Sequence, residues 1–221
     1  MQKFMSNVIG TEWEMPVVLA GMYGLRMSEI IGLRTTNIDL EKMQFGVVEQ
    51  MPFKVPPGTK TITEMAPTKS NDRILPITEE TLPYFLRQFD LIKRQKELIA
   101  ASGGVYYDNK LFIAKPDGSP QRRDRMSANF GQLIRHLEMP HIRFHDLRHS
   151  CASLLLANGV PLKQIQDWLG HSDFSTTTNI YAHLDYSSKL SSAQAMVSGM
   201  PLPEAGDFGS RWEQNAEKSG A

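Results

Sequence analysis

Residues 141–181, HIRFHDLRHSCASLLLANGVPLKQIQDWLGHSDFSTTTNIY, decide the fold and carry most of the candidate functional side chains. His145 and Arg148 stand three positions apart at the head of a predicted helix. Residues with this spacing leave one helix face together, so their nitrogen-bearing groups converge on one small volume. This convergence makes the face a candidate functional site.

A second helix follows the first in the same stretch. Gly159 and Pro161 predict a helix end and a new helix start, with Pro161 suited to a first helical position. The apolar stripe of that second helix is formed by Leu162, Ile165, Trp168 and Leu169. His171 and Tyr181 come after the stripe. An arginine or tyrosine alone is commonly a surface or core residue, and only the joint pattern indicates a site.

Three blocks of the sequence resemble the tyrosine recombinase and phage integrase family: YGLRMSEIIGLRTTNIDL, HDLRHSCASLLLANG and WLGHSDFSTTTNIY. The match covers most of residues 14–184. The resemblance implies the tyrosine recombinase catalytic-domain fold, which is mainly α with a small antiparallel β-sheet (α+β). It also implies an enzyme that cleaves and rejoins DNA through a 3′-phosphotyrosyl intermediate and frees a 5′-hydroxyl, without a cofactor, metal or ATP.

The resemblance assigns six catalytic positions. They are Tyr181 as nucleophile, Arg26 and Arg148 as paired arginines, His145 and His171, and Lys69 on a hairpin within PTKSNDRILPI. Attack on a phosphodiester builds negative charge on non-bridging oxygens, and guanidinium groups match those oxygens in a planar fork. A phenol also needs a proton acceptor at neutral pH. By resemblance His145 assists that proton transfer, His171 bonds the phosphate, and Lys69 protonates the leaving oxygen.

Charge is balanced over the whole chain, with 24 basic and 24 acidic residues, so overall composition does not indicate a nucleic-acid partner. Basic residues nevertheless concentrate before the first helix described above. The partner that we expect is double-stranded DNA, and its candidate contacts are Arg73, Arg122, Arg123, Arg125 and Lys163. By resemblance the protein acts as a homo-tetramer on DNA, with an accessory DNA-bending or excision factor as a further partner.

The sequence also suggests where the protein works. A single cysteine, Cys151, excludes an intrachain disulfide and fits a reducing compartment. No apolar run approaches a membrane span, and the first residues lack the regions of a signal peptide. We expect a cytoplasmic, bacterial or phage-encoded protein associated with the nucleoid and without a membrane partner.

Residues 1–198 are predicted to form one catalytic domain whose N-terminus is truncated partway through a helix. Short strands are expected over 44–49 and 73–77, an extended piece or strand over 110–114, and helices beginning at Thr78 and near Tyr186. Residues 199–221 form a Gly- and Pro-rich tail that cannot build its own core. We expect this tail to dock on a neighbouring protomer.

Two other function classes stay open. His141, His145 and His149 recur every four residues, which allows a His-ligated metallohydrolase, although Pro140 interrupts a continuous helix and no HExxH motif is present. A DNA-binding module that has lost catalysis is the second alternative. Because all six catalytic positions are filled, we favour a site-specific recombinase, first of all an integrase or transposase of a mobile element.

Overall fold

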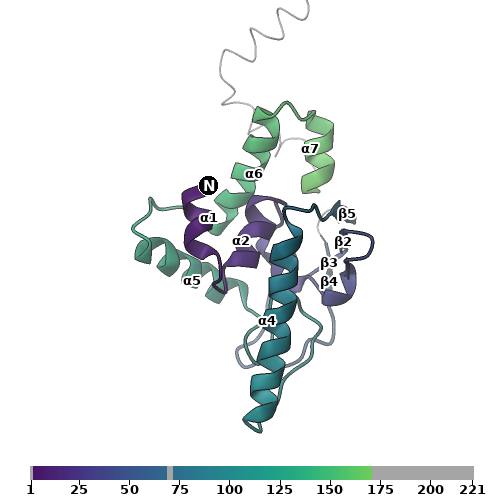
Figure 1. Ribbon diagram of the computed structural model, residues 1–221, viewed down its shortest axis with the longest axis vertical. Helices are drawn as coiled ribbons and strands as arrows, with labels where there is room; N and C mark the ends of the chain where they lie inside the picture. The colour runs from purple at the N-terminus through teal and green to yellow at the C-terminus, as the bar shows by residue number, and fades with distance from the viewer. Residues whose placement is uncertain (1, 69–71, 171–221) are drawn as a thin grey trace, which may run out of the picture. The chain divides into compact units, whose positions relative to one another are not determined.

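Helix α2 (Glu14–Gly21) lies at the centre of the fold, and all of its residues are buried. Its sequence EMPVVLAG is apolar almost all round, as expected for a helix enclosed by other elements. The computed structural model describes residues 2–68 and 72–170. Around α2 it packs α1 (Gln2–Val8), α4 (Leu82–Ala101) and α6 (Phe144–Ala157), as Figure 1 shows.

The strands form two small antiparallel sheets. One has the order β1-β2-β5 and the other pairs β3 with β4. Their bounds are β1 Ile38–Asp39, β2 Gln44–Val47, β3 Glu49–Gln50, β4 Ala66–Pro67 and β5 Arg73–Pro76. In β5, Arg73 and Leu75 are buried while Ile74 is exposed, which is the alternation of a half-buried strand. Arg73 therefore points to the same side as Leu75.

Two short elements precede the first sheet. They are α3 (Met27–Gly32) and the 3-10 helix η1 (Thr35–Asn37). Gly32 allows α3 to lie directly on β3, because a Cβ there would stand 2.4 Å from the backbone nitrogen of Met51. The C-terminal end of α3 is thereby fixed beside β3.

For the middle of the chain, one sequence prediction needed adjustment and another was narrowed to one of its two alternatives. Helix α4 begins at Leu82 rather than at Thr78, because the backbone N–H of Thr78 donates to Thr81 Oγ1 and the chain first makes a turn. Residues 110–114 form an extended piece and not a strand. Two isolated β-bridges hold it, one between Leu111 and Arg34 and one between Ala114 and Pro120. Helix α5 (Arg123–His136) follows, and its Phe130 stacks edge-on to Phe144 of α6.

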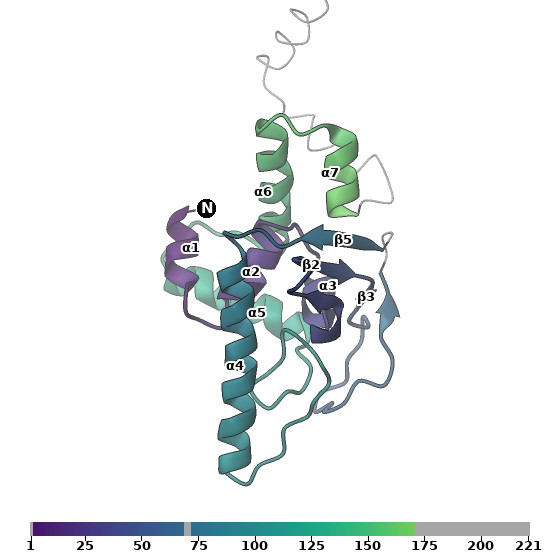
Figure 2. The same ribbon diagram turned by 45° about the vertical axis from the view of Figure 1, so that its right-hand side comes forward.

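Helices α6 and α7 (Leu162–Leu169) stand side by side, and α7 lies next to β5 in Figures 1 and 2. Gly159, with φ of 75°, follows the end of α6 as predicted. Pro161 takes the cap position just before α7 rather than its first turn. The fold is thus mainly α with a small antiparallel sheet, as predicted. The helix expected near Tyr186 and the tail 199–221 lie outside the described residues.

Candidate active site

Arg26 is held at a sharp junction between α2 and α3. Gly24 has φ of 68°, a region that favours glycine, and a Cβ there would lie 2.2 Å from Leu169 Cδ2. Arg26 follows as the extended N-cap residue of α3. Its backbone N–H donates to Glu29 Oε2 and its Nη1 donates to Glu29 Oε1, both at 2.9 Å. One carboxylate therefore fixes both the backbone and the guanidinium of Arg26.

Arg148 lies one turn into α6, and only 3% of it is exposed. Its Nη1 donates to the carbonyl oxygen of Gly24, and its Nη2 donates to that of Leu169 at 2.9 Å. A single guanidinium thus joins α6 to the α2–α3 junction and to the end of α7. Its neighbours leave it little freedom to reorient, as electrostatic preorganisation requires.

The third arginine at this place, Arg73, reaches in from β5. Its Nη2 donates to Glu29 Oε2 at 2.9 Å, and its Nε donates to the Trp168 carbonyl at 3.1 Å. Its side chain is 6% exposed. We predicted a DNA contact for Arg73, and this buried, ion-paired position favours a supporting role instead.

The C-terminal end of α7 collects all three guanidinium groups. Arg73 donates a hydrogen bond to the carbonyl of Trp168, and Arg148 donates one to the carbonyl of Leu169. The Nη2 atom of Arg26 lies 3.4 Å from the carbonyl oxygen of Gly170. The last carbonyls of a helix lack intrahelical partners and carry the negative end of the helix dipole. The arginines therefore cap α7, whose chain turns at left-handed Gly170 immediately before His171 in the sequence.

Burial and charge set the protonation states here. Burial acts to raise the pKa of Glu29, but the hydrogen bond and charge of Arg73, and then those of Arg26, outweigh it and lower the pKa to about 2. Glu29 thus stabilises the fold at neutral pH, and this contribution is lost as the pH falls through the folded-state pKa. Burial, and then the charge of Arg26, lower the pKa of Arg148 to about 9, so Arg148 stays charged at neutral pH.

His145 begins the same helix face one turn before Arg148. Its ring meets that of His149 edge-on, with 4.7 Å between centroids. Burial, then the charges of His149 and Arg148, lower the pKa of His145 below its usual value. These effects favour the neutral imidazole, which is the form that can accept a proton.

The structure places Arg26, Arg148 and His145, whereas Lys69, His171 and Tyr181 lie outside the described residues. Arg26 and Arg148 come from distant parts of the sequence and meet at the end of α7. The sequence analysis did not single out Glu29, which lies between Arg26 and Arg73. The signal was present in the R-x-x-E spacing, because an N3 carboxylate reaches back to the N-cap residue.

Comparison with known proteins decides the family. Residues 9–188 match the family model described as "Phage integrase family". This chain belongs to the phage integrase family. The tyrosine recombinase XerC-like protein of Caldanaerobacter subterraneus subsp. tengcongensis is 30% identical over 188 residues, which cover 81% of this chain and 47% of the relative. The ICEBs1 integrase of Bacillus subtilis is 26% identical over 166 residues, covering 75% and 43%.

A solved integrase structure has the same fold. The Tn1549 transposon integrase in complex with transposon right end DNA superposes with a TM-score of 0.69 at 24% identity, covering 91% of this chain and 64% of that one. This likeness confirms the predicted fold class. The chain spans about half the length of the curated relatives that it matches.

The other predicted DNA contacts of this chain lie on its surface. Arg122 caps α5 and donates to Asp124, and the guanidinium carbon of Arg123 lies 5.3 Å from the centroid of the Phe53 ring. Arg125 is exposed in the same helix turn. Lys163 is exposed in the first turn of α7, with Nζ 2.9 Å from Asp167 Oδ1. These cations stay candidates for DNA contact.

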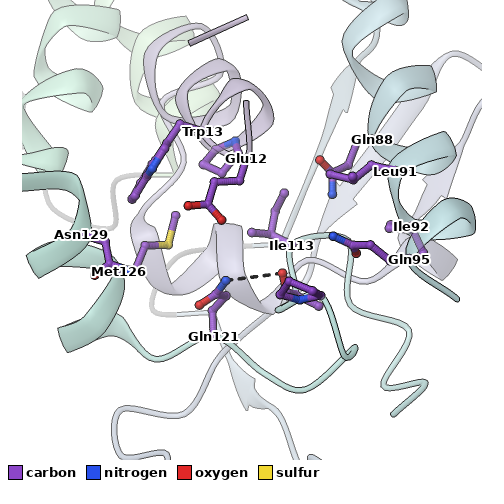
Figure 3. A pocket seen from close by; sticks show the side chains of 13 residues that line it. Glu12, Trp13, Gln88, Leu91, Ile92, Gln95, Ile113, Gln121, Met126 and Asn129 are labelled. Carbon is purple, nitrogen blue, oxygen red and sulfur yellow. Dashed lines mark hydrogen bonds between the residues drawn. The ribbon is translucent and has the colours of Figure 1, made fainter. Parts of the chain in front are cut away.

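Three further observations concern metal binding, a pocket and membrane spans. Within 2–68 and 72–170, no group of three or more His, Cys, Asp or Glu side chains is placed to hold a metal, so His141 does not complete a cluster with the α6 histidines. A pocket lies away from the arginines, between α2, α4 and α5, with Trp13, Gln88 and Met126 among its lining (Figure 3). None of the described helices is long and apolar enough to cross a membrane.

The buried cysteine beside the site gives a first testable expectation. Burial raises the pKa of Cys151 to about 11, against the lowering effect of the Arg148 charge, and its thiol donates to the Met22 carbonyl at 3.2 Å. Since the thiolate is the reactive form, we expect the folded protein to react with a disulfide reagent at least about 100-fold more slowly than the unfolded chain at pH 8. Thiol titration with and without denaturant measures this, and equal rates would contradict the buried position.

Proposed function

We propose that this chain performs the strand cleavage and rejoining of a site-specific DNA recombinase. The observation that carries the proposal is the meeting of Arg26 and Arg148 at the end of α7, with a neutral His145 on the same face of α6 as Arg148. Membership of the phage integrase family supports it. The substrate is double-stranded DNA in the cytoplasm of a bacterium.

The proposed reaction follows from the chemistry of these groups. The phenolic oxygen of Tyr181 attacks phosphorus, forms a 3′-phosphotyrosyl bond and gives its proton to a base, for which His145 is suited. The P–O5′ bond breaks, and Lys69 protonates the departing 5′-oxygen. Arg26 and Arg148 stabilise the charge on the non-bridging oxygens. The phosphotyrosyl bond retains the energy of the broken link, so rejoining needs no ATP.

Integration of a mobile element is the biological role that we favour. One curated relative is named as the ICEBs1 integrase, and the superposed structure is a transposon integrase bound to transposon end DNA. The surface cations Arg122, Arg123, Arg125 and Lys163 are proposed to contact phosphates outside the cleavage site. An accessory DNA-bending or excision factor is a further proposed partner.

The proposed function predicts a covalent protein–DNA complex formed in EDTA. A nicked suicide duplex built from the DNA flanking the gene releases a short fragment after cleavage and so traps the adduct. Because arginines take the place of a metal, we expect the detergent-resistant adduct to form at the same rate with EDTA as without it. Gel electrophoresis in detergent measures the yield.

Each alternative function gives a different result in this experiment. Cleavage that is lost in EDTA and restored by zinc would support the metallohydrolase instead. Specific binding of the duplex without any adduct would support a DNA-binding module that has lost catalysis. Either result would overturn the proposed function.

The tail, residues 199–221, is proposed to dock on a neighbouring protomer within a DNA-bound tetramer. Its large apolar side chains include Leu202, Phe208 and Trp212, which stand in a Gly- and Pro-rich sequence too poor in apolar residues to fold alone. Aromatic anchors of this kind commonly dominate binding energy at interfaces. Residues 1–198 then act as the catalytic unit.

Deleting residues 200–221 is expected to weaken assembly of two DNA sites while single-site binding persists. The reason is that each lost anchor costs about 2 kcal/mol or more at an interface. Gel-shift experiments on duplexes with one and two sites separate the two steps. Unchanged pairing of two sites by the shortened protein would remove the tail from assembly.

A further inference from the structure

Arg73 occupies an unusual place for a strand arginine, because it lies on the buried side of β5. The alternation that buries Leu75 also buries Arg73, and its side chain is 6% exposed. A phosphate of a bound duplex would have to displace buried contacts to reach it. Its inward direction therefore separates Arg73 from the exposed cations of α5 and α7.

The guanidinium of Arg73 spans two different structures. Its Nη1 and Nη2 face both oxygens of Glu29 at 3.4 and 2.9 Å, while its Nε donates to the Trp168 carbonyl at 3.1 Å. Figure 2 shows β5 and α7 next to each other at this place. One planar group thus joins the start of α3 to the end of α7, which a lysine ammonium cannot reproduce with the same geometry.

Glu29 connects Arg73 to Arg26, because its carboxylate accepts hydrogen bonds from both arginines. The carboxylate of Glu29 has no exposed surface, and it accepts bonds from both the backbone N–H and the Nη1 of Arg26. A buried carboxylate is stable only when charged donors hold it. Since the Arg26 side chain is 25% exposed, the less exposed Arg73 is the firmer of these two partners.

We propose that Arg73 is a positioning residue for strand cleavage: through Glu29 it orients the guanidinium of Arg26, and through Trp168 it fixes the end of α7 that leads into His171. This assignment rests on the proposed function and replaces the DNA contact predicted for Arg73 from the sequence. The residue acts through its neighbours and does not touch the phosphate.

Two variants test the assignment. Arg73→Lys keeps the charge but removes the planar fork, and Arg87→Lys is the matched control, because Arg87 makes a comparable fork to Glu14 between α4 and α2, away from the arginines of the site. We expect Arg73→Lys to lower single-turnover cleavage of saturating suicide duplex about 10- to 100-fold, consistent with small misplacements of catalytic groups. Arg87→Lys should cleave at the wild-type rate.

DNA affinity and its salt dependence distinguish positioning from phosphate contact. A lost phosphate contact reduces the slope of log K against log salt by about one, whereas loss of positioning leaves the slope unchanged. Arg73→Gln removes the charge and is the variant for this measurement, and we expect its slope to equal that of wild type and its affinity to stay within about threefold at every salt concentration measured. A smaller slope with an unchanged cleavage rate would return Arg73 to the DNA-contact group.

A double-variant experiment distinguishes positioning from general stabilisation. If Arg73 acts through Arg26, Arg73→Lys should slow the Arg26→Lys variant by much less than it slows wild type. Two results would leave Arg73 with a structural role only and overturn the proposal. In the first, the cleavage rate of the double variant falls by the product of the two single-variant factors. In the second, the loss of cleavage by Arg73→Lys equals the loss of folded protein.

Amide exchange without DNA completes the test and does not depend on catalysis. Arg73→Lys should speed exchange at α7 and at the start of α3, and Arg87→Lys should not. Unchanged exchange at both places would overturn the proposal even for an active enzyme. A wild-type protein that forms no adduct would instead overturn the proposed function, and exchange alone would then decide whether Arg73 restrains Arg26 and α7.

Discussion

Replacing Tyr181 by phenylalanine is expected to abolish the covalent DNA complex, with adduct reduced to the background of a reaction without protein. The variant lacks the only atom of that side chain that can attack phosphorus, so no rearrangement of the arginines or histidines compensates for it. Binding of the duplex should stay within about threefold of wild type, because one hydroxyl is a small part of an interface dominated by phosphate contacts. Detergent gels measure the adduct, and gel shifts measure binding.

Tyr186 provides the matched control, since it stands five positions further along the same segment, NIYAHLDYSS. Tyr186→Phe should form adduct at the wild-type rate. Digestion of the wild-type adduct and sequencing of the DNA-linked peptide should identify Tyr181 directly. If Tyr181→Phe still traps DNA, the nucleophile has been assigned to the wrong residue.

Sequence reasoning succeeded where the signals were local. The helix start before His145, the helix end at Gly159 and the new start after Pro161 all depend on residues within a few positions of one another. The spacing of His145 and Arg148 likewise follows from the helix period alone. For this reason the first helix of the deciding stretch was predicted with His145 and Arg148 on one face.

Arg73 shows a local signal that was available but outweighed. Alternation along RILP places Arg73 with Leu75 on the buried side, yet we predicted Arg73 to be a DNA contact. Its partner Glu29 lies on α3, and sequence alone does not show which carboxylate a buried arginine will meet. The pairing is a property of the tertiary fold.

The carbonyl groups that hold the arginines were beyond prediction for a different reason. Every residue has a carbonyl, and only the ends of helices leave these groups without intrahelical partners. The contacts of Arg148 with Gly24 and Leu169 therefore depend on where α2 and α7 end and on how the two ends approach each other. The catalytic roles of all six positions stay predictions from the sequence.

Replacing Arg148 by lysine is expected to lower single-turnover cleavage about 1000-fold, at the upper end of what removal of one preorganised donor costs. The arginine donates from one nitrogen to Gly24 and from another to Leu169, and its planar group is held against the site by both. An ammonium is a single point at the end of a flexible stem, so it cannot keep both carbonyls and also meet two phosphate oxygens. Arg143→Lys is the control, because Arg143 pairs with Asp146 on the exposed start of the same helix.

The pH dependence of the Arg148→Lys variant should identify the cause of the loss. Burial and the nearby Arg26 lower the pKa of Arg148 to about 9, and the same surroundings favour the neutral form of a lysine, whose pKa is lower than that of arginine from the start. The cation is the protonated form, so it is present at low pH and is lost as the pH rises through the folded-state pKa. Cleavage by Arg148→Lys relative to wild type should therefore fall as the pH is raised from about 6 to about 9. If the ratio of the variant rate to the wild-type rate is constant across this pH range, the whole loss is due to geometry. If Arg148→Lys cleaves within tenfold of wild type, the buried guanidinium at position 148 is not the group that stabilises the phosphate.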